Sequence, residues 1–218
     1  MIHIDKDPTL KDYFAQVGLK TEGFYTGELD NWFGDKSREA LSKGREKIVG
    51  QNRPDEDGAV NTNVRCWSPT TAQLRAKYGE VGENQTMVEC PYPLRLDWDL
   101  EVTIQKFSCH KLVCDEIRQA MEKILATYGL ERIQELGLDR FGGCLNVRKK
   151  RGGSSYSTHA WGIAVDWFPS ANTFRETSKT ARFATPAYKQ FMDIWQNLGW
   201  MSLGRCYDFD WMHFQRNP

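Results

Sequence analysis

Residues that could hold a metal ion lie in two short stretches near the C-terminal end of the 218-residue chain. The first stretch runs from Ser157 to Asp166 and contains His159, and the second runs from Asp210 to His213. The chain has only four histidines, and each stretch holds one of them close to a carboxylate. A catalytic zinc ion takes three protein ligands of nitrogen and oxygen type and keeps one position for water. His159, Asp166 and His213 supply such a set, and they are the candidate zinc ligands.

The segment from Ile163 to Trp167 alternates as a β-strand would. Successive side chains of a strand point to opposite faces, so Gly162, Ala164 and Asp166 are expected to share one face. Two very small side chains beside a carboxylate leave a shallow floor on which a metal ion and a substrate backbone fit.

Asp210 is the candidate general base for a water molecule at the metal, because it lies three residues before His213. Residues three apart on a regular strand point to opposite faces. The sequence therefore predicts a turn, bulge or helical twist at Trp211 and Met212, so that both side chains reach the same site.

A cationic side chain is expected to polarise the scissile carbonyl and to stabilise the oxyanion. Arg148 is the first candidate because it directly follows an expected strand, and Arg151 is the alternative. Arg151, Ser157 and Trp161 are the candidate substrate-binding residues. Ser157 is expected to support His159 or the adjoining turn, because no further histidine is available to activate it as a nucleophile.

Apolar spacing and breaker residues outline the elements that must position this site. A helix is expected from residue 109 to 128, ended by Gly129, with a short second helix over 130–136 and another over 188–197. Strands are expected over 100–104 and from 141 towards 148, residues 80–95 read as a domain boundary, and the segment 200–214 is strand-like. His110 has no second ligand at helical spacing and is expected to be structural.

The overall composition excludes several classes of protein. Lys and Arg together number 29 and equal the sum of Asp and Glu, which argues against binding nucleic acid by neutralising its phosphates. No apolar run is long enough to cross a membrane, and the N-terminus lacks the pattern of a signal peptide. The six cysteines form no CxxC pair and are expected to be buried free thiols in a reducing compartment.

The N-terminal part of the chain resembles the small three-helix peptidoglycan-binding domain. The resemblance covers about residues 5–80 and rests on Gly23-Phe-Tyr-Thr-Gly27, Leu29-Asp30, Phe33-Gly34 and Thr71-x-x-Leu74. It implies a helical domain over residues 1–80 that binds the cell wall, with Tyr25, Asp30, Trp32 and Phe33 as the candidate wall-binding residues. The open alternative is a helical lid that has no ligand of its own.

The C-terminal part resembles the D-Ala-D-Ala carboxypeptidase family of zinc peptidases, which includes the L-alanyl-D-glutamate endopeptidases used as bacteriophage endolysins. The resemblance covers roughly residues 90–218 and rests on Ser157-x-His159-x-x-Gly162-x-Ala164-x-Asp166 followed by Asp210-x-x-His213. It implies an α+β fold over residues 81–218, with a central antiparallel sheet and flanking helices. It also implies zinc ligation by His159, Asp166 and His213, an acid/base role for Asp210, and an oxyanion-stabilising arginine before the motif.

Together the two resemblances predict a modular, monomeric zinc endolysin that cleaves a peptide bond in peptidoglycan, with the L-Ala–D-Glu bond as the first choice. Without a signal peptide, such a protein is expected in the host cytoplasm until it is released to the periplasm and cell wall. The alternatives are a D-Ala-D-Ala carboxypeptidase or dipeptidase, and a catalytically silent wall-binding virion protein.

Overall fold

The computed structural model describes Lys20, Gly23, residues 25–28, 36–37 and 39–40, and all of residues 66–218. The chain divides into two compact units, and almost all described residues belong to the second, which holds Pro69–Pro218. Within the described part, no helix is long and apolar enough to cross a membrane.

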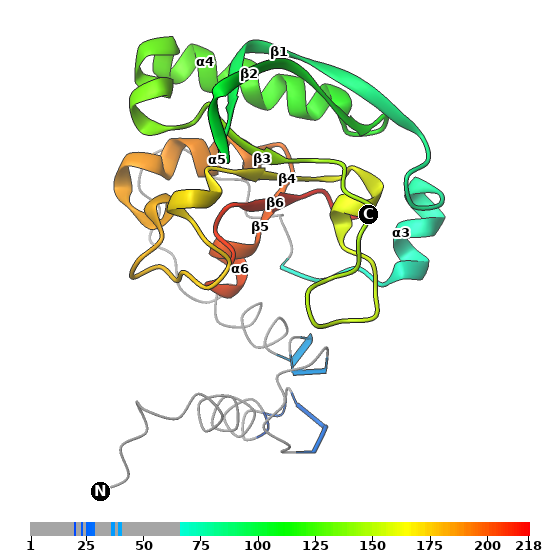
Figure 1. Cartoon of the computed structure of the whole chain (residues 1–218). Coiled ribbons are helices and arrows are strands. Elements are labelled where there is room, and N and C mark those ends of the chain that lie inside the picture. Colours follow the sequence, from blue (N-terminus) through cyan, green and yellow to red (C-terminus); the bar gives the residue numbers. More distant parts are fainter. Residues whose placement is uncertain (1–19, 21–22, 24, 29–35, 38, 41–65) are drawn as a thin grey trace, which may run out of the picture. The chain divides into compact units, whose positions relative to one another are not determined.

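The second unit is built on a six-stranded sheet with the strand order β2-β1-β3-β4-β6-β5 (Figure 1). The strands are β1 (Gln85–Leu96), β2 (Asp99–His110), β3 (Arg140–Gly143), β4 (Ala164–Trp167), β5 (Met201–Ser202) and β6 (His213–Gln215). The expected α+β fold is confirmed, but the sheet is mixed. β1 and β3 pair in parallel through Arg95 with Arg140 and Leu96 with Phe141, while the other pairs are antiparallel. The parallel pair arises because a helix carries the chain from the end of β2 back to the start of β3.

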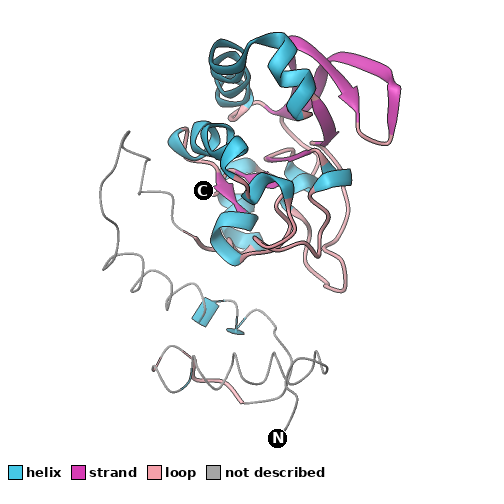
Figure 2. Ribbon diagram, turned by 90° about the vertical axis from the view of Figure 1, so that its left-hand side faces the viewer, coloured by secondary structure: helices cyan, strands magenta, loops and turns pink. Residues whose placement is uncertain are grey.

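That connecting helix, α4 (Cys114–Leu136), lies along the hairpin of β1 and β2, as Figures 1 and 2 both show. It begins five residues later than predicted, because Cys109 and His110 pair with Thr86 and Gln85 as the end of β2. Cross-strand pairing has overridden the helical spacing of the sequence here. The predicted break at Gly129 is confirmed, since this residue has φ 69° and interrupts the helix.

Two further helices follow β4. Helix α5 (Lys189–Asn197) agrees with the predicted range of 188–197. The segment 200–214 is not a continuous strand, because helix α6 (Leu203–Tyr207) separates β5 from β6. The Ser202 side chain caps α6 by accepting a hydrogen bond from the Arg205 amide, which is the usual way for a serine to start a helix.

The hydrophobic core lies on one face of β3 and β4. Val165 and Trp167 are fully buried there against Phe191 and Trp195 of α5 and the apolar side of α4. Asp166 lies between these two residues and points to the opposite face, so the predicted alternation is confirmed within β4. Gly162, which was predicted to share the face of Asp166, lies outside the strand, because it ends the preceding 3₁₀ turn with φ 68°. One face of β4 therefore packs in the hydrophobic core, and the other face carries Asp166, the candidate metal ligand.

The helix that precedes β1 belongs to this second unit. Helix α3 (Thr71–Tyr78) starts with a capping box between Thr70 and Gln73 and buries Leu74 and Tyr78 in the core. The Tyr78 hydroxyl donates a hydrogen bond to the backbone carbonyl of Arg216 at 3.1 Å. The domain boundary therefore differs from the predicted one after residue 80, and the helix predicted to close the N-terminal domain packs on the sheet unit instead.

The cysteines divide into two classes. Cys90, Cys109, Cys114 and Cys144 are free thiols, as expected. Cys66 and Cys206 are disulfide-bonded, so the expectation that all six cysteines are free is wrong.

Candidate metal centre

His159 lies in a single 3₁₀ turn, Thr158–Trp161, that leads into β4. The Ser157 side chain caps this turn by accepting a hydrogen bond from the His159 amide at 3.4 Å. Gly162 ends the turn with φ 68°, a left-handed conformation that glycine adopts without steric cost. A Cβ atom on Gly162 would lie 2.9 Å from the His110 amide nitrogen, so the close approach of β2 also requires glycine.

Asp166 and His213 are direct cross-strand partners on β4 and β6, and Gly143 of β3 pairs with Asp166 on the other side. A Cβ atom on Gly142 would lie 2.9 Å from the Cβ atom of Asp166, so this face of β3 has no room for a side chain there. The antiparallel register therefore sets the two side chains beside each other.

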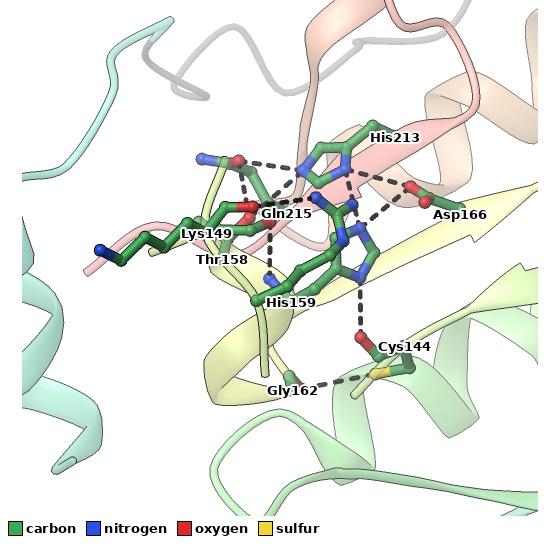
Figure 3. A network of polar contacts seen from close by, with 10 residues as sticks. Cys144, Lys149, Thr158, His159, Gly162, Asp166, His213 and Gln215 are labelled. Atoms are coloured by element: carbon green, nitrogen blue, oxygen red, sulfur yellow. Dashed lines mark hydrogen bonds and ion pairs between the residues drawn. The ribbon is translucent and has the colours of Figure 1, made fainter. Parts of the chain in front are cut away.

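Three side-chain atoms converge to form a nearly equilateral triangle (Figure 3). The His159 Nε2 atom lies 3.1 Å from His213 Nδ1 and 3.2 Å from Asp166 Oδ1, and His213 Nδ1 lies 3.0 Å from Asp166 Oδ1. His159 and His213 are buried, and Asp166 is nearly so. The structure thus brings together all three predicted zinc ligands.

The hydrogen bonds behind the two imidazoles determine which ring nitrogens face the centre of the triangle. His159 Nδ1 lies 2.7 Å from the Cys144 carbonyl, which can only accept, so Nδ1 carries the proton. His213 Nε2 lies 3.0 Å from Gln215 Oε1, and the same amide oxygen accepts a hydrogen bond from the Thr158 hydroxyl at 3.2 Å. In the neutral imidazoles, Nε2 of His159 and Nδ1 of His213 therefore present lone pairs to each other and to Asp166.

A group of three acceptors without a hydrogen between them is electrostatically unfavourable unless a cation lies between them. A tetrahedral zinc ion with bonds of about 2.0–2.2 Å holds its ligand atoms about 3.3–3.6 Å apart, slightly more than the separations found here. Two imidazole nitrogens and a carboxylate oxygen are a ligand set that suits zinc, and three protein ligands leave a fourth position open. The residues therefore fit a zinc ion.

The charges at the site support the same conclusion. Burial alone would raise the pKa of Asp166, but the neighbouring His159 and His213 lower it far below its usual range. Burial would lower the pKa of His213, but its hydrogen bond to Asp166 and the charge of that residue raise it. A carboxylate held ionised in a buried position draws a cation to this point, whether a proton or a metal ion.

Asp210 lies beside the triangle, at the start of the turn that precedes β6. Its φ of 53° and the hydrogen bond from the His213 amide to its carbonyl at 3.0 Å form a tight turn over Trp211 and Met212. The predicted break in strand geometry is therefore confirmed. Burial has the largest effect on the pKa of Asp210 and raises it. His213 lowers this pKa and Asp166 raises it, and the resulting pKa is about 6. Its Oδ1 atom is buried and has no hydrogen-bond partner among the described residues.

The two candidate arginines lie in the loop that leads to the 3₁₀ turn. Lys149 and Tyr156 bridge this loop, and the Ser157 amide donates to the Arg148 carbonyl at 3.0 Å. The Arg148 guanidinium contacts the carbonyl of Lys149 at 3.4 Å. The charge of Arg151 lowers the pKa of Asp210, and the Arg151 guanidinium lies 5.6 Å from the ring centre of Phe174, whose carbonyl accepts a hydrogen bond from the Asp210 amide.

The other predicted site residues differ in their placement. Ser157 is buried as the cap of the 3₁₀ turn, which agrees with its supporting role. Trp161 has no exposed surface, and its indole N–H donates to the Gly79 carbonyl at 2.9 Å. The assignment of Trp161 to substrate binding is therefore corrected, because its side chain supports the packing of α3 instead. His110 is structural as predicted, with Nε2 2.9 Å from the Tyr78 carbonyl.

The predicted wall-binding residues mostly lie outside the described part of the chain. Asp30, Trp32 and Phe33 are not described. Tyr25 is described and buried, and its hydroxyl donates a hydrogen bond to the Glu28 carbonyl at 2.9 Å. Its local role is to close a turn.

Sequence reasoning missed two groups of residues at the site. Gln215 holds His213 from behind, and its position two residues further along β6, on the same face, is a signal that could have found it. The aromatic residues Phe174 and Phe209 lie next to Asp210, and Tyr207 packs on Phe209. Phe174 is 36 positions away from Asp210 in the sequence and carried no signal.

Comparison with protein-family models, with curated proteins and with solved structures yields no match for this chain.

Proposed function

We propose that this chain is a zinc-dependent hydrolase that cleaves a peptide bond in the stem peptide of peptidoglycan. The observation that carries the metal site is the convergence of two imidazole nitrogens and one carboxylate oxygen at 3.0–3.2 Å from one another. His159, Asp166 and His213 would hold the ion, with the Cys144 carbonyl and Gln215 fixing the two imidazole rings from behind.

A zinc ion at this point would supply Lewis-acid chemistry, which polarises a carbonyl and makes water a better nucleophile at neutral pH. Asp210 is suited to move the protons, because a carboxyl with a pKa of about 6 gains and loses a proton near neutrality. It would accept a proton from the attacking water and pass it to the nitrogen of the leaving amine. The Arg151 guanidinium would stabilise negative charge that develops on the carbonyl oxygen.

Peptidoglycan is proposed as the substrate on the basis of the sequence motif, Ser157-x-His159-x-x-Gly162-x-Ala164-x-Asp166 with Asp210-x-x-His213. The same metal centre could serve an endopeptidase or a carboxypeptidase, since both hydrolyse an amide. We favour the L-Ala–D-Glu endopeptidase reaction, and the products distinguish the two.

The test combines metal analysis with mass spectrometry of digested sacculi. The purified protein is expected to contain about one zinc per chain and to release stem peptides that leave L-Ala on the glycan. Dipicolinate and the variant His213→Ala should each abolish release, while Asp99→Asn on the exposed hairpin should leave it intact. Release of free D-Ala would identify a carboxypeptidase.

Zinc binding without any cleavage would identify a silent wall protein. Cleavage that survives both chelation and His213→Ala would exclude the metal mechanism.

A further inference from the structure

Three aromatic side chains form a cluster on the Asp210 side of the metal centre. The ring centroids of Phe174 and Phe209 lie 5.7 Å apart at an interplanar angle of 76°, and those of Tyr207 and Phe209 lie 6.2 Å apart at 32°. Phe174 comes from the loop after β4, Tyr207 is the last residue of α6, and Phe209 lies between α6 and β6. We call Phe174, Tyr207 and Phe209 the aromatic cluster.

The aromatic cluster is tied directly to the candidate acid/base residue. The Asp210 amide donates a hydrogen bond to the Phe174 carbonyl at 3.2 Å, and Phe209 is the residue before Asp210. The Arg151 guanidinium carbon lies 5.6 Å from the centre of the Phe174 ring, within the range of a cation–π contact. Three loops therefore meet beside Asp210 and place aromatic and cationic groups there.

The three rings lie outside the hydrophobic core. The core cluster of the second unit includes Phe168 and Phe183 but none of the aromatic cluster. Phe174 exposes 37% of its surface, and Tyr207 and Phe209 are partly exposed. Partly exposed aromatic rings beside a site suit a ligand that has both an apolar face and polar edges.

We propose that the aromatic cluster, with Arg151, is a subsite for a neutral saccharide ring, namely the glycan sugar that carries the stem peptide. This inference rests on the proposed function. In peptidoglycan the sugar is joined through a lactyl group to the first residue of the stem, so it lies within about two residues, or roughly 7 Å, of a bond cleaved after that residue. The apolar face of a pyranose stacks on aromatic rings, while the guanidinium donates hydrogen bonds to its hydroxyl and acetamido oxygens. An anionic ligand is disfavoured, because Asp208 and Asp210 flank Phe209.

The first test measures binding and does not depend on catalysis. Tri-N-acetylchitotriose, a neutral glycan without peptide, is titrated into the full-length protein in the presence of chelator and followed by NMR. Binding is expected for the unaltered protein and is expected to weaken about tenfold in Phe174→Leu, because a flat aromatic face is lost. Leucine retains apolar bulk and the backbone carbonyl that holds Asp210. The matched control is Trp98→Leu at the hairpin turn, where the side chain is 67% exposed.

The second test separates a subsite from a structural role. Phe174→Leu is expected to raise KM about tenfold on a muramyl-linked stem peptide, with kcat unchanged, and to leave both constants unchanged on the same peptide without sugar. Equal losses on both substrates, or no glycan binding by the unaltered protein, would overturn the subsite even if hydrolysis occurs. Conversely, glycan binding that is sensitive to Phe174→Leu but unaffected by Trp98→Leu would sustain the subsite even if the protein cleaved no stem peptide.

Discussion

The two imidazoles of the candidate metal centre use different ring nitrogens, and the reason lies in the residues behind them. The Cys144 carbonyl accepts from Nδ1 of His159, whereas Gln215 accepts from Nε2 of His213. A backbone carbonyl cannot be removed by substitution, but a glutamine side chain can. The Gln215 amide oxygen also accepts from Thr158, and its amide group donates to Asn217. The orientation of the His213 ring therefore depends on a series of side-chain hydrogen bonds through Gln215, which a substitution can break.

We predict that Gln215→Leu weakens zinc binding by about 10- to 100-fold, because His213 loses the acceptor that fixes its tautomer and ring angle. Competition with a chromophoric chelator measures the affinity. Gln215→Glu retains an acceptor oxygen and should remain close to the unaltered protein. Equal affinity of the leucine variant and the unaltered protein would show that Gln215 does not orient the ligand.

Asp210 should destabilise the metal-free protein at neutral pH. Its pKa is about 6 in the folded protein against an ordinary value of 3.8. Between these values the folded state binds more protons than the unfolded state, so the free energy of unfolding falls as pH rises through this window. Above about pH 6 the protein remains at the lower stability.

We therefore predict that Asp210→Asn raises the free energy of unfolding of the chelated protein by about 1–3 kcal/mol at pH 7.5 and has little effect at pH 3.5. Urea denaturation of both proteins at the two pH values measures the difference. Asp99→Asn, an exposed substitution, provides the control. A variant that is no more stable than the unaltered protein at pH 7.5 would contradict the assigned burial cost. The same variant should lose hydrolysis of sacculi, since the amide cannot accept a proton.

At the scale of the elements, the site depends on the short connection between the 3₁₀ turn and β4. The backbone turns at Gly162 from the 3₁₀ turn into β4. The Gly162 carbonyl accepts a hydrogen bond from the His110 amide at 2.9 Å. This contact joins the ligand turn to the end of β2. The position of His159 therefore depends on how closely β2 approaches.

We predict that Gly162→Ala lowers the free energy of unfolding by about 2–4 kcal/mol, because it combines a left-handed backbone with a steric clash against β2. Gly153→Ala is the matched control in the loop before the turn, where a Cβ atom would meet its nearest neighbour at 3.6 Å. It should change stability by less than about 0.5 kcal/mol. Chemical denaturation in the presence of chelator keeps metal binding out of the comparison.

The sequence predicted the site better than the sheet. The three residues of the candidate metal centre, the turn over Trp211 and Met212 and the break at Gly129 follow from local spacing and from residue chemistry. The hairpin of β1 and β2 was missed because Pro91 and Pro93 read as a boundary. The irregular register between Glu89 and Leu94 absorbs these prolines within the strand. The parallel pairing of β1 with β3 joins residues 45 positions apart and leaves no local pattern.

At the scale of the whole molecule, α3 decides where the sheet unit begins. Leu74 and Tyr78 are almost fully buried, and the carbonyls of Tyr78 and Gly79 contact His110 and Trp161. A unit cut at the predicted boundary after residue 80 would lose all of these contacts. It would also leave the polar atoms of His110 and Trp161 without their partners.

We predict that residues 66–218 form a stable fragment that binds one zinc ion, whereas residues 81–218 unfold with a free energy lower by at least about 4 kcal/mol. Thermal and urea denaturation of the two fragments measure the difference. Tyr78→Phe in the longer fragment removes only the hydroxyl and should cost about 1 kcal/mol. Equal stability of the two fragments would place α3 outside the cooperative unit.

The pairing of Asp166 with His213 has a consequence for how the fold persists. The two ligands are 47 residues apart in the chain, and His159 and His213 are 54 apart. One ion would therefore close long loops of the polypeptide at the middle of the sheet, as a removable cross-link between β4, β6 and the 3₁₀ turn. Because side chains alternate along a strand, a one-residue slip of β6 against β4 would turn His213 into the core and break that cross-link. The ion would thus stabilise only the register of β6 against β4 that places His159, Asp166 and His213 together, and so would select that register during folding.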